Sequence, residues 1–248
     1  MLDLKVELEL YLYEVVVREI PGPGLLVKLL STSLLLITLS LSWVSKATAH
    51  PHVWVDAAVL IHKNDYGQIV AIEPVWIFDD LYTATLLPDL DKDENGDVEK
   101  NELLTFAKEA VQNLAEWDFF LDARNQTGEG LNFKDNITTE SLLINDRLLL
   151  RFKLMLEQPI AVAHTIELRM YDPSYFVAIE LVKEGVVSFL PKDDALKSSN
   201  TCQYEMLDPL DNENNQTPLA ELSFSDEEVA ENPELGSIFA QSLRVSCQ

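Results

Sequence analysis

The stretch VWVDAAVLI, residues 53–61, decides how this chain is expected to fold. Every second side chain in it is small or apolar: Val53, Val55, Ala57, Val59 and Ile61. An alternation with period two places such side chains on one face of a β-strand, so a half-buried strand is predicted. The turn signal Asn-Asp-Tyr-Gly follows at 64–67. Residues 68–78 are therefore expected to return as a second strand, interrupted at Pro74.

The spacing of apolar residues changes from two to three or four in one later segment. Residues 101–117 are predicted to form a helix whose buried face carries Leu103, Ala107, Ala110, Leu114 and Trp117. A shorter helix at 81–87 is expected to end near Pro88. These elements define a helical insert, residues 79–117, in a chain that is otherwise rich in strands.

The spacing of the apolar residues returns to two after residue 118. Strands are predicted at 148–156, 164–171 and 175–181, and Gln158-Pro159 is expected to end the first of them. The predicted fold class is α+β: a mostly antiparallel sheet over residues 50–191 that contains the helical insert.

Composition and charge exclude one large class of partner. The chain has 248 residues, of which 47% are hydrophobic and 24% charged, and its formal net charge is −24. A phosphate backbone is bound by clustered Lys and Arg, which this sequence lacks, so we expect no nucleic-acid partner. The acidic balance attracts cations, although acidic surfaces also serve solubility.

The N-terminal region has the pattern of a secretory signal. Residues 29–44 carry no charge, follow Lys28 and lead into Ala47-Thr48-Ala49. A spanning helix usually needs about 20 apolar residues, so we expect cleavage after Ala49 rather than a retained anchor. Residues 1–25 are too acidic for the start of a signal, and translation is expected to begin just after them. Residues 1–49 are thus predicted to be a signal peptide with a spurious leader.

Two cysteines, Cys202 and Cys247, lie near the C-terminus. An even number of cysteines in an exported chain predicts a disulfide. It would close a loop of about 45 residues and add roughly 4 kcal/mol to stability through loop entropy. Residues 192–248 are otherwise acidic and irregular, and they are expected to form an appendage that the disulfide staples.

The sequence DKDENGDVEKNE, residues 91–102, matches the twelve-residue calcium loop of an EF-hand at each position. Gly96 allows the sharp turn, and the insert 79–117 is therefore predicted to be EF-hand-like. The expected ligands are Asp91, Asp93, Asn95, Asp97 through its backbone carbonyl, Glu99 through a water, and Glu102. Oxygen ligands favour Ca²⁺ over Zn²⁺ or Ni²⁺. An acidic surface turn is the alternative.

The calcium is expected to be structural. A sensor opens a pair of long helices, whereas the predicted first helix is short and contains Pro88.

Histidines supply a second candidate metal site. After cleavage, His50 would be the first residue, and its amine and imidazole could chelate one ion that His52 also reaches. His164 is either a core histidine or a third ligand from across the sheet. Nitrogen ligands of this kind suit Zn²⁺, Ni²⁺ or Co²⁺. The alternative interpretation of HPH at 50–52 is a polar beginning of the strand.

Five segments together resemble one family of bacterial periplasmic proteins, DUF1007. They are AHPHVW at 49–54, FDD at 78–80, DKDENG at 91–96, YDPSYF at 171–176, and GSIFA followed by a cysteine at 236–247. The family is labelled the periplasmic component of an ABC-type transport system. The resemblance implies a periplasmic location and an inner-membrane metal transporter as partner, because members are encoded beside nickel/cobalt-type or zinc-related transporters.

The sequence thus leads to one hypothesis and two alternatives. The leading one is a periplasmic accessory protein that is not an enzyme and that binds Zn²⁺, Ni²⁺ or Co²⁺ for transport. The first alternative is a calcium-stabilised protein-interaction module without a transition metal. The second is a copper enzyme with an N-terminal histidine, although no catalytic motif such as GxSxG or HExxH occurs in the chain.

Overall fold

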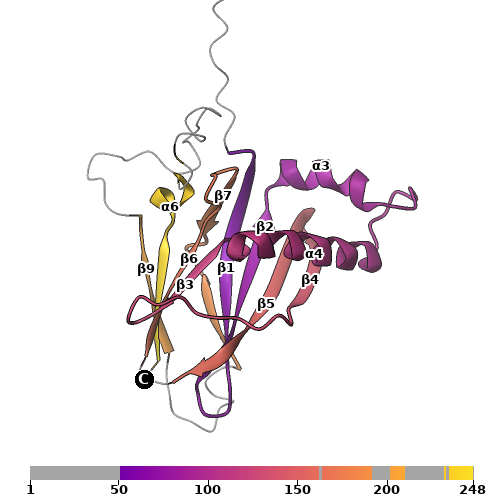
Figure 1. Cartoon of the computed structure of the whole chain (residues 1–248). Coiled ribbons are helices and arrows are strands. Elements are labelled where there is room, and N and C mark those ends of the chain that lie inside the picture. The colour runs from indigo at the N-terminus through magenta and orange to yellow at the C-terminus, as the bar shows by residue number, and fades with distance from the viewer. Residues whose placement is uncertain (1–50, 162–163, 192–201, 210–231, 233–234, 248) are drawn as a thin grey trace, which may run out of the picture. The chain divides into compact units, whose positions relative to one another are not determined.

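The computed structural model describes residues 51–161, 164–191, 202–209, 232 and 235–247. Within these residues the chain forms two sheets and a helical layer (Figure 1). The elements are β1 (Val53–Lys63), β2 (Ile69–Phe78), α3 (Asp80–Leu90), α4 (Lys100–Leu114), the 3₁₀ helix η1 (Ala115–Phe120), β3 (Leu121–Asn125), β4 (Thr138–Ile144), β5 (Arg147–Ile160), β6 (Thr165–Met170), β7 (Val177–Leu181), β8 (Val187–Leu190), β9 (Cys202–Leu207), α6 (Leu235–Phe239) and β10 (Ser242–Cys247). None of the described helices is long and apolar enough to cross a bilayer.

The first sheet has the strand order β4-β5-β2-β1-β7, and β8 also pairs with β1. The second has the order β3-β6-β10-β9. β7 and β8 run parallel to β1, one beside residues 53–57 and the other beside 59–62. The other strand pairs of the described residues are antiparallel. The predicted mostly β fold is confirmed, whereas the two parallel pairings were not predicted.

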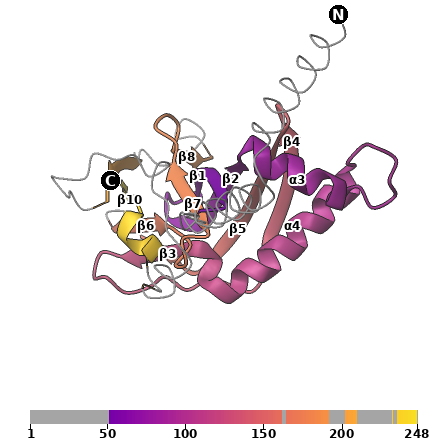
Figure 2. The same cartoon turned by 90° about the horizontal axis from the view of Figure 1, so that it is seen from above.

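One core joins the two sheets and α4. The alternating side chains of residues 53–61 are all buried, as the pattern predicts, and β5 buries Leu148, Leu150, Phe152, Leu154 and Leu156. α4 lies against β4 and β5 (Figure 2) and contributes Leu103, Ala107 and Val111 to the same core. Each large apolar side chain buried in this way stabilises the fold by roughly 1.5–3 kcal/mol.

Pro74 does not end β2 and Pro159 does not end β5, so both predicted interruptions are wrong. β2 continues through Pro74, which pairs with Val59 of β1. On the other side, the pairing with β5 passes from Ile72 to Val75, across the position where Pro74 has no N–H to donate. Pro159 lies in a bulge near the end of β5, because the register there shifts between Ile69 and Ala71.

The helices differ from the predicted ones at their ends. α3 continues past Pro88 to Leu90 and is capped by Asp79, whose carboxylate accepts the N–H of Tyr82 at 2.8 Å. α4 ends at Leu114 rather than at residue 117. Residues 118–120 then take positive φ values of 51°, 60° and 50°, which turns the chain toward β3. Trp117 is consequently 59% exposed, whereas Val111 of α4 is buried in the core.

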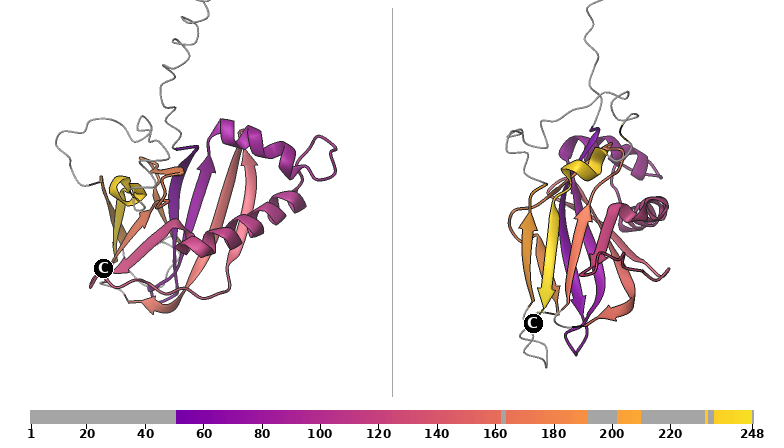
Figure 3. Two further views of the ribbon diagram at one scale, coloured as in Figure 1. Left: turned by 45° about the horizontal axis from the view of Figure 1, so that its top comes forward. Right: turned by 60° about the vertical axis from the view of Figure 1, so that its left-hand side comes forward.

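The C-terminal strands belong to the main fold. β10 lies inside the second sheet between β6 and β9 (Figure 3, right), and Leu243 and Val245 are fully buried. The prediction of a separate appendage at 192–248 is therefore wrong for the residues described there. The predicted disulfide is confirmed: Cys202 and Cys247 lie opposite each other on β9 and β10 and are bonded.

Candidate metal-binding loop and histidines

The loop between α3 and α4 begins at Asp91, directly after α3, and ends where α4 starts (Figure 3, left). Glu99 caps α4 in a reciprocal arrangement with Glu102. The N–H of Glu99 donates to the Glu102 carboxylate at 2.9 Å, while the Glu99 carboxylate accepts a backbone N–H of the first helical turn. This capping box fixes the carboxylate of Glu102 beside the loop.

Three carboxylates converge in this loop. Oxygen atoms of Asp91, Asp93 and Glu102 lie within 4.8 Å of one another. Elsewhere in the described ranges, no other group of three or more His, Cys, Asp and Glu side chains comes together in this way. Glu102 is buried and the two aspartates are more exposed, so the set opens to solvent on one side.

Asp91 also organises the backbone of the turn. Its carboxylate accepts the N–H of Asn95 at 3.1 Å and the N–H of Gly96 at 2.8 Å. Gly96 has a φ of +93°, and a Cβ there would meet nothing within 4 Å. The position thus requires glycine because of its backbone conformation rather than for lack of space.

The carboxylate of Glu102 remains ionised because the backbone donates to it. The N–H of Glu99 is the main cause of its lowered pKa, the Glu99 side chain is the next, and the N–H of Lys92, at 2.6 Å, adds to the effect. Hydrogen bonds to the charged form of an acid favour that form. The loop therefore holds a fixed negative charge at its inner end.

The remaining predicted ligands are engaged with one another. The side-chain oxygen of Asn95 accepts the N–H of Asp97 at 2.8 Å, and its NH₂ group donates to Glu99 at 2.6 Å. The carboxylates of Asp97 and Glu99 do not belong to the converging set. Of the six predicted ligands, the structure therefore brings together the carboxylates of Asp91, Asp93 and Glu102.

Of the candidate histidine ligands, the structure describes His52 and His164, and these two lie far apart. His50 lies outside the described residues. The exposed ring of His52 contacts the ring of Phe176 in a tilted arrangement, with centroids 4.5 Å apart, at the point where β1 begins. Ile160 lies at the opposite end of the sheet, across from Ile69, and the N–H of His164 donates to the carbonyl of Ala161, the next residue, at 3.3 Å. β1 has 11 residues and spans about 35 Å, so His164 cannot share an ion with His52, and its prediction as a third ligand is wrong.

Comparison with known proteins supplies the family. The family model described as "Protein of unknown function (DUF1007)" matches residues 35–247. The chain belongs to the DUF1007 family. An uncharacterised protein of Haemophilus influenzae is 25% identical over 206 residues, which cover 81% of this chain and 92% of that protein. The DUF1007 match includes loop 91–102, the three candidate histidine ligands His50, His52 and His164, and both cysteines.

A charged row that no local sequence pattern predicts crosses the first sheet of this DUF1007 protein. The Nε2 atom of His62 lies 2.6 Å from the carboxylate of Glu73, whose other oxygen is 3.6 Å from Arg151. Arg151 in turn donates to Glu140 at 2.7 Å. These residues come from β1, β2, β5 and β4, so only the strand register reveals the row. It is a structural ion-pair network.

Acid should weaken this row by protonating Glu73. The hydrogen bond from His62, with smaller effects of Arg151 and Lys153, lowers the pKa of Glu73 below its ordinary value of 4.5. Because the folded-state pKa is the lower one, the stabilisation is present above about pH 4.5 and is lost as the pH falls through the folded-state pKa. Glu73→Gln should therefore flatten the acid limb of stability in urea unfolding between pH 3 and 6, roughly the range over which this carboxyl titrates. The exposed control Glu157→Gln should leave the acid limb of stability unchanged. Equal slopes in both variants would contradict the assignment.

Proposed function

We propose that this DUF1007 protein is exported, is not an enzyme, and binds a Ca²⁺ ion in an EF-hand-like loop formed by residues 91–102. The observation that supports this best is the convergence of the Asp91, Asp93 and Glu102 carboxylates within 4.8 Å. Three negative charges at this separation repel one another, and a divalent cation relieves the repulsion. The oxygen donors suit a hard cation, and the backbone carbonyl of Asp97 is the further ligand that EF-hand loops supply.

The expected role of the ion is to stabilise the helical layer. It would join the end of α3, at Asp91, to the first turn of α4, at Glu102. α4 buries Leu103, Ala107 and Val111 in the core shared by both sheets, which opposes the large helix movement of a calcium sensor. A structural ion therefore accounts better for this packing than a switch does.

Calcium should raise the melting temperature of the wild-type protein. At a concentration about 100-fold above its Kd, a ligand that binds only the folded state stabilises it by about 2.7 kcal/mol. For a chain of this size the shift is roughly 5–10 °C. Glu102→Gln should abolish most of the shift, because it removes one of the converging charges. Thermal melts followed by circular dichroism with Ca²⁺ or with EDTA measure both variants.

Glu109→Gln is the matched control. Glu109 lies exposed on the same helix, and its substitution changes the net charge equally. It should keep the full calcium response. If Glu102→Gln responds to Ca²⁺ as Glu109→Gln does, the ion does not bind in this loop.

A transition-metal role is the second candidate. His52 is exposed at the start of β1, two residues after His50, which supports a site made by these two histidines and a free N-terminal amine. Such a protein would carry Zn²⁺, Ni²⁺ or Co²⁺ in the periplasm, with an inner-membrane metal transporter as partner. His164 takes no part in this site.

This candidate predicts a defined pattern among histidine variants. The mature protein that begins at His50 should bind Ni²⁺ at least about tenfold more tightly than its His50→Ala, His52→Ala variant, because the variant loses both imidazoles. His164→Ala should bind as the wild type does, since His164 lies beside Ala161, just past the end of β5 that is far from His52. Competition with a chromophoric chelator measures these affinities. Equal affinity in the wild type and the double variant would exclude the site.

A further inference from the structure

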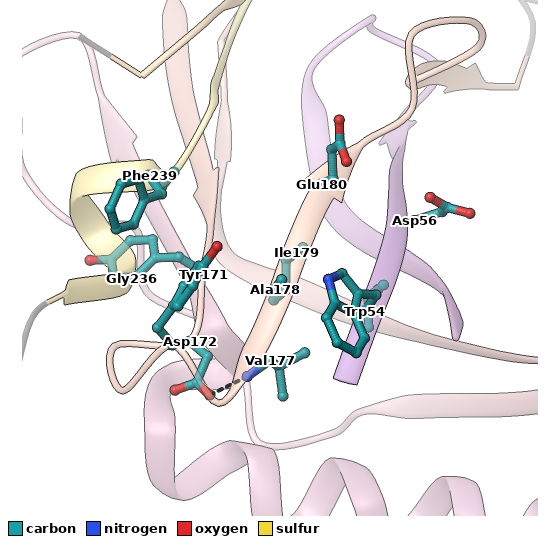
Figure 4. Close-up of a pocket in the computed structure, with 13 residues that line it drawn as sticks. Trp54, Asp56, Tyr171, Asp172, Val177, Ala178, Ile179, Glu180, Gly236 and Phe239 are labelled. Carbon is teal, nitrogen blue, oxygen red and sulfur yellow. Dashed lines mark hydrogen bonds between the residues drawn. The ribbon is translucent and has the colours of Figure 1, made fainter. Parts of the chain in front are cut away.

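Side chains from four separate segments surround a small pocket at β7 (Figure 4). Trp54 and Asp56 come from β1, Glu180 comes from β7, Tyr175 from the turn before it, and Phe239 from α6. Ala178 lies directly across from Trp54 in the strand register, and its small side chain leaves room above β7. We refer to this site as the β7 pocket. It shares no residue with loop 91–102.

Two carboxylates lie side by side at this pocket. Asp56 and Glu180 are opposite each other in the parallel pairing of β1 and β7, so they project from the same face. Like charges in that position destabilise a sheet. Arg147 contacts Asp56 at 2.8 Å, but Glu180 is exposed and forms no ion pair within the described part of the chain. The pocket therefore has an uncompensated negative charge in a protein of net charge −24.

Aromatic rings provide the other lining. The ring of Trp54 is 36% exposed, although it belongs to an interior strand of the sheet. Tyr175 is buried and lies 5.3 Å from the ring of Phe239, measured between centroids. Burial, and the nearby charge of Glu180, raise the pKa of Tyr175 to about 12, so its phenol is neutral. Faces of such rings attract cations.

The pocket is built rigidly. Tyr175 has a positive φ of 56°, which costs energy for a bulky residue and is maintained by its surroundings. The Asp172 carboxylate accepts the N–H groups of Ser174 and Val177 at 2.9 Å each. Gly236 packs so closely on this turn that a Cβ would lie 1.8 Å from the Asp172 carbonyl oxygen. Strained, well-supported segments of this kind are concentrated at binding sites.

We propose that the β7 pocket binds an organic cation, an ammonium or guanidinium group, between the ring of Trp54 and the carboxylates of Asp56 and Glu180. Aromatic faces combined with carboxylates recognise such groups through cation–π attraction and charged hydrogen bonds. A bare divalent metal ion fits less well, because these carboxylates are not part of a converging set of three ligands among the described residues. The group could belong to a free small molecule or to an Arg or Lys side chain of a partner protein.

Arginine amide and citrulline amide are the probes that test this proposal. Both are used here with the α-amine acetylated, so that they differ only in having a charged guanidinium or a neutral urea group of the same shape. Titration of the full chain is followed by NMR through the indole N–H signal of Trp54, which the Trp54→Phe variant assigns. Arginine amide should shift this signal with at least about tenfold higher affinity than citrulline amide. Equal affinity would overturn the proposal.

Two charge-matched variants separate the pocket from the general acidity of the protein. Glu180→Gln should weaken arginine amide binding about fivefold, whereas Glu116→Gln, an exposed change of the same net charge on η1, should leave it within about twofold. Both glutamates are on the surface, so neither variant endangers folding. Equal weakening by the two variants would show non-specific attraction and would overturn the site.

A third arm distinguishes the source of the cation and uses the peptide Gly-Arg-Gly with blocked ends. Tighter binding of the peptide than of arginine amide supports the site and assigns the cation to a protein side chain. Tighter binding of arginine amide with its α-amine left free, a group that the peptide lacks, supports the site and assigns the cation to a small molecule. Failure of both to shift the Trp54 signal would overturn the proposal.

Discussion

Replacing Cys202 and Cys247 by serine is expected to lower the free energy of unfolding by about 4 kcal/mol. The disulfide closes a loop of 45 residues, and loop entropy in the unfolded chain is the main source of this figure. The two cysteines face each other on β9 and β10, and β10 lies inside the second sheet. Urea unfolding of the variant and of the oxidised wild type measures the difference.

The reduced wild-type protein is the control for this prediction. It retains both sulfur atoms, so it separates loss of the bond from loss of the side chains. Reduction should lower stability nearly as much as the double substitution does. A loss below about 1 kcal/mol in both samples would mean that β9 and β10 are held in place without the bond.

Gly236→Ala is expected to cost about 3 kcal/mol or more, the upper range for overpacking. The new methyl group would lie 1.8 Å from the carbonyl oxygen of Asp172 and 2.8 Å from its carbonyl carbon, both of which are backbone atoms. The backbone must therefore move, and with it the hydrogen bond at 3.1 Å from the N–H of Gly236 to the carbonyl of Pro173. Thermal and urea unfolding should both show the loss.

Gly130→Ala provides the comparison. A Cβ at Gly130 meets nothing within 4 Å, so the substitution should change stability by less than about 0.5 kcal/mol. Equal stability of the two variants would contradict the close contact between α6 and the turn at Asp172. In the Gly236 variant we also expect the contact between the rings of His52 and Phe176, which follows that turn, to weaken.

Local patterns predicted the strands well where one face is buried. The alternation of residues 53–61 and of 148–156 matches the buried side chains of β1 and β5. The same signal exists in SLRVSC, where Leu243, Val245 and Cys247 alternate, but the acidic residues before it favoured an appendage. Parallel pairing of β7 and β8 with β1 depends on contacts more than 100 residues apart in the sequence, for which no local pattern exists.

The expectation that proline interrupts a strand was wrong because it depends on where the missing N–H falls in the strand pairing. Pro74 and Pro159 were expected to interrupt strands. The missing N–H of Pro74 falls where the pairing of β2 with β5 passes from Ile72 to Val75, and that of Pro159 falls in a bulge. Trp117 was predicted to be buried because it continues the helical spacing. The left-handed turn at 118–120 ends that spacing, and no glycine marks it in the sequence.

The candidate loop could be found from twelve consecutive residues, whereas the β7 pocket could not. Ligand spacing in loop 91–102 is local, so the sequence alone predicts Asp91, Asp93 and Glu102, whose carboxylates converge in the structure. Asp56 and Glu180 become neighbours only through the register of two strands. The error over His164 has the same origin, because the direction and register of β2 and β5 place Ala161, and His164 beside it, far from His52.

Equilibrium dialysis against ⁴⁵Ca²⁺ tests the calcium loop most directly, because it counts ions rather than inferring them from stability. The full chain is first freed of metal with EDTA and then dialysed at millimolar calcium. It should bind one calcium ion per molecule, and Glu102→Gln should bind none. A wild-type chain that holds no calcium under these conditions, or a variant that holds as much as the wild type, would contradict the proposed function.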